Sequence, residues 1–264
     1  MALPCFIANW KMNKTVDETL LYLAIFQKRL SDFPLQDKVS DWIEVILAPP
    51  YTSLFSAGNK IKELSLPIGL AGQNFYFESE GPYTGEVSSR MLCDAGCQYV
   101  IIGHSERRNH FGEDDFVIGQ KVQSAMGAGL IPILCVGESA KERQEGRTLE
   151  VVKRQVKEGF CRVDEKSRFA LSQSIIAYEP VWAIGTGKTP TPCEVEQVHQ
   201  EIARVSSGAR VLYGGSVNEE NVAAFMKEPH LNGMLVGGAS LSAETFVNII
   251  QRGMVGHGLC APAQ

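Results

Sequence analysis

The hydrophobic residues of this chain are concentrated in short uninterrupted runs, which are separated by longer stretches of mixed apolar and polar character. The runs are rich in Ile, Val and Leu and do not alternate with polar residues, as is typical of parallel strands that are covered on both faces. We expect eight such runs to be strands, at residues 5–8, 43–48, 68–71, 99–103, 131–135, 175–178, 211–213 and 234–236.

Amphipathic stretches that are expected to be helices follow these runs. They cover residues 17–30, 52–64, 88–95, 114–128, 139–160, 192–205, 219–227 and 242–251. Strict alternation of strand and helix predicts an α/β fold with a parallel sheet and right-handed crossovers. Eight units in 264 residues match the size of a single (β/α)8 barrel with eight parallel strands. A doubly wound open sheet is the alternative.

The chain contains no linker-like stretch, so one catalytic domain is expected to occupy residues 1–252. The last segment, residues 253–264, has Gly, Pro and Ala without periodicity and is expected to be a frayed tail.

Composition narrows the class of protein further. The net charge of −5 argues against a nucleic-acid partner, and no apolar run reaches the length of a membrane span. The N-terminus lacks the features of a signal peptide, and seven cysteines make a poor disulfide framework, so we expect a reduced, cytoplasmic protein. Cys93 and Cys97 could face one way on a helix, but no second pair at zinc spacing completes the set. No metal site is predicted.

Polar residues stand directly after several of the expected strands, where the chemistry of such barrels is located. Asn9 and Lys11 follow the first strand, His104 and Glu106 the fourth, and Glu179 the sixth. Alone, the histidine would be read as structural and the glutamate as a surface residue. Together with a lysine they form a set that can abstract a proton beside a carbonyl, and this chemistry requires no metal. Glu138, after the fifth strand, is a further titratable candidate.

Two glycine pairs follow the last two strands. Gly214-Gly215 precedes Ser216, and Gly237-Gly238 begins the next loop. Glycine lets backbone N–H groups approach an anion closely, and the loops after strands 7 and 8 are the usual phosphate site of this barrel. One pair would be weak evidence, but two pairs in these two loops favour phosphate binding.

A long loop after the sixth strand is rich in Gly and Pro. It does not fit a P-loop, because Trp182 stands where a glycine is needed, and it does not fit a dinucleotide fingerprint, because of Pro190. A mobile lid is the better interpretation. The expected lid residues are Pro180, Val181, Trp182, Ala183, Ile184, Gly185, Thr186, Gly187, Lys188, Thr189 and Pro190.

Five motifs occur in one order along the chain. They are NWKMN at 9–13, GHSERR at 103–108, YEPVWAIGTG at 178–187, YGGSV at 213–217 and LVGGASL at 235–241. In these motifs the chain resembles the triosephosphate isomerase family, from about residue 4 to about residue 251. The resemblance implies the TIM barrel fold, a place in glycolysis and gluconeogenesis, and the interconversion of dihydroxyacetone phosphate and D-glyceraldehyde 3-phosphate without a cofactor.

The resemblance also implies a role for each site residue. Glu179 would be the base that moves a proton between two carbons through an enediolate, and a neutral His104 would polarise the carbonyl. This family is itself the standard example of a glutamate base paired with a neutral histidine, so both roles are carried over from the family. Lys11 and Asn9 would contact the substrate oxygens, and Glu106 would pair with Lys11 or relay a conformational change. Phosphate contacts would come from the loop residues Gly185, Ser216, Gly237 and Gly238.

A homodimer is implied in the same way. The stretch 72–90 looks like a loop that enters a partner subunit, and the contact residues would be Met12, Thr84, Gly85 and Glu86. One departure from the family concerns the lid: its far hinge carries Pro190, which has no N–H to bond the hydroxyl of Tyr213. Two alternatives stay open, an isomerase for another sugar phosphate, such as a tetrulose phosphate, and a catalytically silent barrel that serves as a scaffold.

Overall fold

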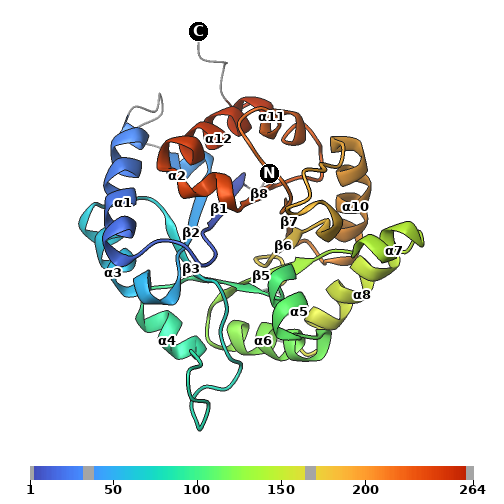
Figure 1. Ribbon diagram of the computed structural model, residues 1–264, viewed down its shortest axis with the longest axis horizontal. Helices are drawn as coiled ribbons and strands as arrows, with labels where there is room; N and C mark the ends of the chain where they lie inside the picture. The colour runs from blue at the N-terminus through green and yellow to red at the C-terminus, as the bar shows by residue number, and fades with distance from the viewer. Residues whose placement is uncertain (1–2, 32–38, 164–170, 260–264) are drawn as a thin grey trace.

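The computed structural model describes residues 3–31, 39–163 and 171–259. Its centre is a closed ring of eight parallel strands that is surrounded by helices (Figure 1). The first and last strands pair with each other, with Cys5 opposite Gly233 and Ala8 opposite Val236. This pairing closes the ring, so the (β/α)8 barrel is confirmed and the open-sheet alternative is wrong.

The eight strands lie within two residues of their expected positions. They are β1 (Cys5–Asn9), β2 (Glu44–Ala48), β3 (Gly69–Gly72), β4 (Tyr99–Ile102), β5 (Ile131–Val136), β6 (Ile175–Tyr178), β7 (Arg210–Tyr213) and β8 (Gly233–Val236). Every residue of β1, β4, β6 and β8 is buried, which explains why these strands read as continuous apolar runs rather than as alternating ones.

The helices cover the outside of the ring (Figure 1). They are α1 (Val16–Ser31), α2 (Val39–Trp42), α3 (Tyr51–Glu63), α4 (Ser89–Asp94), α5 (Ser105–Phe111), α6 (Asp115–Gly127), α7 (Ala140–Gln144), α8 (Thr148–Phe160), α10 (Pro192–Val205), α11 (Val222–Phe225) and α12 (Ala243–Gly256). Two short 3-10 helices, η3 (Val181–Ala183) and η4 (Gly238–Leu241), lie at the carboxyl end of the barrel.

Besides the additional short helix α2 and a shorter α11, the structure differs from the expected helices in three places. The single helix expected at 139–160 is two, because Gly146 adopts a φ of 70° between α7 and α8. The short helix α5, directly after His104, was not among the expected stretches. At the C-terminus, α12 continues to Gly256 and buries Met254, so residues 253–256 are helix rather than a frayed tail. Residues 260–264 of that expected tail lie outside the described residues.

Two apolar cores support this architecture. The larger one fills the layer between strands and helices, and the smaller one fills the inside of the ring. Inside the ring, side chains come from alternate positions of each strand, such as Cys5 and Ile7 on β1 and Ile175 and Ala177 on β6. The same alternation places the next residues, two positions further on, over the carboxyl end of the ring.

Candidate active site

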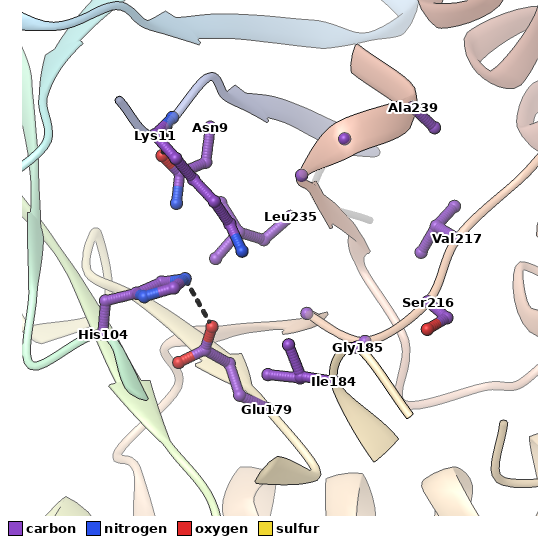
Figure 2. A pocket seen from close by; sticks show the side chains of 14 residues that line it. Asn9, Lys11, His104, Glu179, Ile184, Gly185, Ser216, Val217, Leu235 and Ala239 are labelled. Carbon is purple, nitrogen blue, oxygen red and sulfur yellow. Dashed lines mark hydrogen bonds and ion pairs between the residues drawn. The ribbon is translucent and has the colours of Figure 1, made fainter. Parts of the chain in front are cut away.

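A cavity of about 270 Å³ opens at the carboxyl end of the strands (Figure 2). Asn9 and Glu179 reach it because they continue the inward-facing series of β1 and β6. Every substrate- or phosphate-contacting residue expected from the sequence lines this cavity. The lining residues are Asn9, Lys11, His104, Glu179, Ile184, Gly185, Gly214, Gly215, Ser216, Val217, Leu235, Gly237, Gly238 and Ala239.

His104 and Glu179 lie in direct contact on one side of this cavity (Figure 2). Nε2 of His104 is 2.8 Å from Oε1 of Glu179, and both side chains are less than a tenth exposed. The other carboxylate oxygen of Glu179 accepts the backbone N–H of Ser105 at 2.9 Å. Nδ1 of His104 accepts the backbone N–H of Glu106 at 3.2 Å. The ring nitrogen that faces the carboxylate is therefore the one that carries the proton.

The surroundings of this pair shift both of its pKa values. Burial raises the pKa of Glu179, but the adjacent His104, the Ser105 N–H and the Lys11 ammonium lower it more, so its pKa is below the ordinary value. Burial lowers the pKa of His104, but the carboxylates of Glu179 and Glu106 raise it more. The raised pKa of the histidine therefore depends mainly on Glu179 remaining beside it.

Lys11 is held over the cavity by an unusual backbone conformation. Its φ is 52°, in the left-handed region that residues other than glycine seldom adopt. Asn9 Oδ1 accepts the N–H of Lys11 at 3.1 Å, and Gln73 Nε2 donates to its carbonyl oxygen at 2.8 Å. The ammonium group forms an ion pair with Glu106 at 2.6 Å. This pair places Glu106 beside Lys11, as the resemblance implied, although Glu106 does not itself line the cavity.

Glycine-rich loops form the other side of the cavity (Figure 2). Ser216 and Val217 follow β7, and Gly237 and Gly238 follow β8 and lead into η4. The hydroxyl of Ser240 donates to the carbonyl oxygen of Gly237 at 2.7 Å and so holds this turn in place. The His104–Glu179 pair and the glycine loops thus face each other across the cavity.

The expected lid begins as η3 and continues as a loop. Ile184 and Gly185 line the cavity, and residues 185–189 are exposed. The first end of the lid is anchored outside the cavity: the indole N–H of Trp182 donates to Glu138 at 2.9 Å, and the Tyr178 hydroxyl lies 3.1 Å from the same carboxylate. Burial raises the pKa of Glu138, while these donors lower it in part. The structure therefore places Glu138 under the lid rather than in the cavity.

Several neighbours of the site were not found from the sequence, among them one lining residue and two glutamines outside the cavity. Leu235 lines the cavity, and Gln73 holds the Lys11 backbone. The side-chain oxygen of Gln155 accepts the backbone N–H of Gly137 at 2.7 Å and holds this residue in place. A Cβ atom on Gly137 would lie 1.7 Å from the carbonyl oxygen of Glu179, so only glycine fits there. The alternation of inward-facing residues along β8 is the one signal that could have found Leu235.

In residues 3–31, 39–163 and 171–259, no three His, Cys, Asp or Glu side chains are grouped so that they could hold a metal ion. In the same described ranges, the helices are all too short or too polar to span a bilayer.

Comparisons with known proteins agree on one family. A model of the triosephosphate isomerase family matches residues 4–253. The triosephosphate isomerase of Endomicrobium trichonymphae is 41% identical over 259 residues, covering 95% of this chain and 99% of the relative. That of Aquifex aeolicus is 43% identical over 251 residues, covering 92% and 96%. The crystal structure of triosephosphate isomerase from Bartonella henselae superposes with a TM-score of 0.81 at 36% identity, covering 95% of this chain and 99% of that one.

Proposed function

This chain belongs to the triosephosphate isomerase family, and we propose that it interconverts dihydroxyacetone phosphate and D-glyceraldehyde 3-phosphate with Glu179 as the base and His104 as the electrophile. No cofactor is needed, because the reaction only moves protons. The observation that carries the assignment of roles is the 2.8 Å contact between the two side chains on one side of a cavity whose other side is lined by glycine loops.

The reaction can be written through these residues. Glu179 takes a proton from the carbon beside the carbonyl, and the electron pair of that C–H bond forms the double bond of an enediolate. The developing negative charge lies on the former carbonyl oxygen, which Nε2–H of His104 and the Lys11 ammonium stabilise. Glu179 then returns the proton to the neighbouring carbon, and His104 moves a proton between the two oxygens. Asn9 donates a hydrogen bond to the substrate oxygens.

A neutral His104 is consistent with the geometry of the ligand-free site. The bond that Nδ1 accepts from the Glu106 N–H is available only when that nitrogen is unprotonated. Glu179, whose charge raises the pKa of His104, must leave the ring to reach a substrate carbon. The lowering effect of burial then prevails, and the ring acts as a neutral donor.

The phosphate of the substrate would lie against the glycine loops. Backbone N–H groups of Gly185, Gly237 and Gly238 and the hydroxyl of Ser216 are the donors that we assign to it. Closure of the lid over residues 180–190 would exclude water and hold the phosphate away from the geometry in which an enediolate expels it. The cavity, with a volume of about 270 Å³, can accommodate a small phosphorylated sugar.

We further propose a homodimer. Met12 is 96% exposed and Phe111 is 66% exposed, which is unusual for such large apolar side chains. The segment between β3 and α4 leaves the barrel as a protruding loop (Figure 1). Its tip, with Thr84, Gly85 and Glu86, is exposed. A second copy would cover these surfaces, and the loop of one subunit would pack near Met12 of the other.

Sedimentation velocity combined with activity measurements tests the dimer. Replacing Met12 by a charged residue, as in Met12→Glu, is expected to shift the protein toward a monomer and to lower its activity. A wild-type monomer with full activity at the assay concentration would contradict the dimer. The exposed Phe116→Glu, which is not part of the proposed contact, serves as the matched control.

A coupled assay with both triose phosphates and a tetrulose phosphate tests the reaction. Rapid turnover of the trioses alone supports the proposal, and we expect the enzyme to act in the cytoplasm in glycolysis and gluconeogenesis. Preference for the tetrulose phosphate would identify a different isomerase. No turnover with any of the three would leave the scaffold alternative, although that alternative gives no reason for the chain to carry Lys11, His104 and Glu179 together.

A further inference from the structure

Arg143 contacts the first turn of the lid and the helix that follows the lid. It lies on α7, the short helix after β5, and its guanidinium stacks on the indole of Trp182, 3.9 Å from the ring centroid. Its Nη2 also donates to Oε1 of Glu194 at 2.7 Å. Trp182 belongs to the first turn of the lid, and Glu194 to the first turn of α10, which begins directly after the lid. The Arg143 side chain therefore bridges the first turn of the lid and the first turn of α10.

Each of these two contacts is itself anchored. The Trp182 N–H is bonded to the buried carboxylate of Glu138, and Nη1 of Arg143 lies 3.8 Å from the same carboxylate. Glu194 uses its second oxygen to accept both the N–H and the hydroxyl of Thr191, at 2.8 and 2.9 Å. Thr191 directly follows Pro190, the last residue of the lid. A displacement at either end of the lid would therefore disturb one of the two contacts that Arg143 makes.

The chemistry of an arginine suits this bridging position. Its planar guanidinium can stack its face on an aromatic ring while its edge donates to a carboxylate, which a lysine ammonium cannot do in the same way. The Arg143 side chain is 36% exposed, so its ion pair with Glu194 adds little to the stability of the fold. The two contacts instead hold the two hinges of the lid, Trp182 at its start and the first turn of α10 after its end, at fixed positions relative to each other.

We propose that Arg143 is a positioning residue that couples the two hinges of the lid, an inference that rests on the proposed function of the lid. With Arg143 in place, Trp182 and the first turn of α10 keep the same relative position, and residues 184–189 move as one piece between them. Without it, each hinge moves by itself and the closed lid is populated less. The enediolate is then exposed to water more often and loses its phosphate more often.

Three variants test the proposal: Arg143→Met, Arg143→Lys and the control Arg147→Met. Arg147 is a neighbouring arginine that pairs with Glu145 two residues away instead of with the hinges. We measure kcat and KM, the inorganic phosphate released per isomerisation, and trypsin cleavage after Lys188, an exposed lid residue, by mass spectrometry. Phosphate per isomerisation is a ratio, so a smaller folded fraction does not change it.

For Arg143→Met we expect kcat to fall by about fivefold with little change in KM. A fall of this size corresponds to the loss of one stacking contact and one exposed ion pair. Phosphate release per isomerisation and cleavage after Lys188 should both rise several-fold. Arg143→Lys keeps the charge and should recover part of each loss, and Arg147→Met should resemble the wild type.

Equal phosphate release and equal cleavage in Arg143→Met and Arg147→Met would overturn the role of Arg143. Lack of isomerase activity in the wild-type chain would overturn the proposed function instead. Cleavage after Lys188 needs no turnover and would still decide, in that case, whether Arg143 restrains the lid.

Discussion

Two carboxylates at opposite ends of the barrel are held by different kinds of partner. Glu44 begins β2 at the amino end, where it accepts the Tyr99 hydroxyl at 2.5 Å and pairs with Arg210 at 2.5 Å. Glu179 lies just beyond β6 at the carboxyl end, where its partners are the Ser105 N–H and His104. Both carboxyl groups have pKa values below the ordinary one despite burial, which by itself raises them.

The difference lies in what each partner can do. An arginine stays charged at any working pH and holds its carboxylate permanently, so the Glu44 cluster stabilises the barrel. A histidine can release its carboxylate and work as a neutral donor, and a cavity lies beside it to receive a ligand. The comparison indicates that a charged cluster becomes a reactive site when its partners are themselves changeable and adjoin a cavity.

The largest effect is expected from shortening the carboxylate at the reactive end. Glu179→Asp should bind substrate nearly as well as the wild type but lose about 100-fold or more in kcat, because the carboxylate no longer reaches the proton. Steady-state kinetics with glyceraldehyde 3-phosphate provides the measurement. Near-native turnover would show that Glu179 is not the base.

Removing the charge of the carboxylate at the other end should affect stability instead. Glu44→Gln leaves the half-buried Arg210 without its charge partner and should lower the free energy of unfolding by about 2 kcal/mol, with kcat/KM per folded molecule unchanged. Urea unfolding at fixed protein concentration measures the loss. Glu63→Gln is the matched control, because Glu63 pairs with Lys60 on the surface and is 65% exposed. A loss of activity in Glu44→Gln would remove the distinction between the two ends.

The pH dependence of activity tests whether His104 lowers the pKa of Glu179. A base works when deprotonated, so a lowered pKa keeps Glu179 active as the pH falls below the ordinary carboxyl value. His104→Gln removes the largest lowering influence, so the acid limb of kcat/KM should move to higher pH. His110 is an exposed histidine on α5, the helix that follows His104, and His110→Gln should leave that limb in place. An unmoved limb in His104→Gln would mean that His104 does not set the pKa of the base.

The smallest effects concern the closed lid. Tyr213 stacks on Phe225 with ring centroids 4.5 Å apart, and its buried hydroxyl, which lies near the backbone N–H of Ser216, makes no hydrogen bond to the lid in the described part of the chain. Because Pro190 has no N–H to offer, Tyr213→Phe should change kcat little. Ser216→Ala should lower kcat several-fold, since one neutral hydrogen bond contributes about 1 kcal/mol. Equal losses in the two variants would show that Tyr213 has found another partner in the closed lid.

Much of the architecture follows from local properties of the sequence. Doubly covered parallel strands must be continuously apolar, so all eight could be located, and the polar residues directly after them marked the rim that carries the chemistry. The glycine-rich turns after β7 and β8 and the long loop after β6 could also be predicted, because glycine permits and proline fixes backbone conformations that regular helices and strands do not use. Even the division of the expected helix at 139–160 has a local cause, the positive φ of Gly146, but a glycine does not reveal by itself which conformation it will adopt.

Closure of the ring and the contacts across it depended on tertiary structure. Lys11 and Glu106 are 95 residues apart and meet only because β1 and β4 end at the same rim. Gln73 and Arg143 look like ordinary polar residues in the sequence, since nothing in their neighbours shows that they hold the Lys11 backbone or bridge the lid. Residue type and spacing determine which side chains leave each strand at the rim. Which of those side chains touch one another is decided by the packing of elements that are distant in the chain, and no local pattern contains that information.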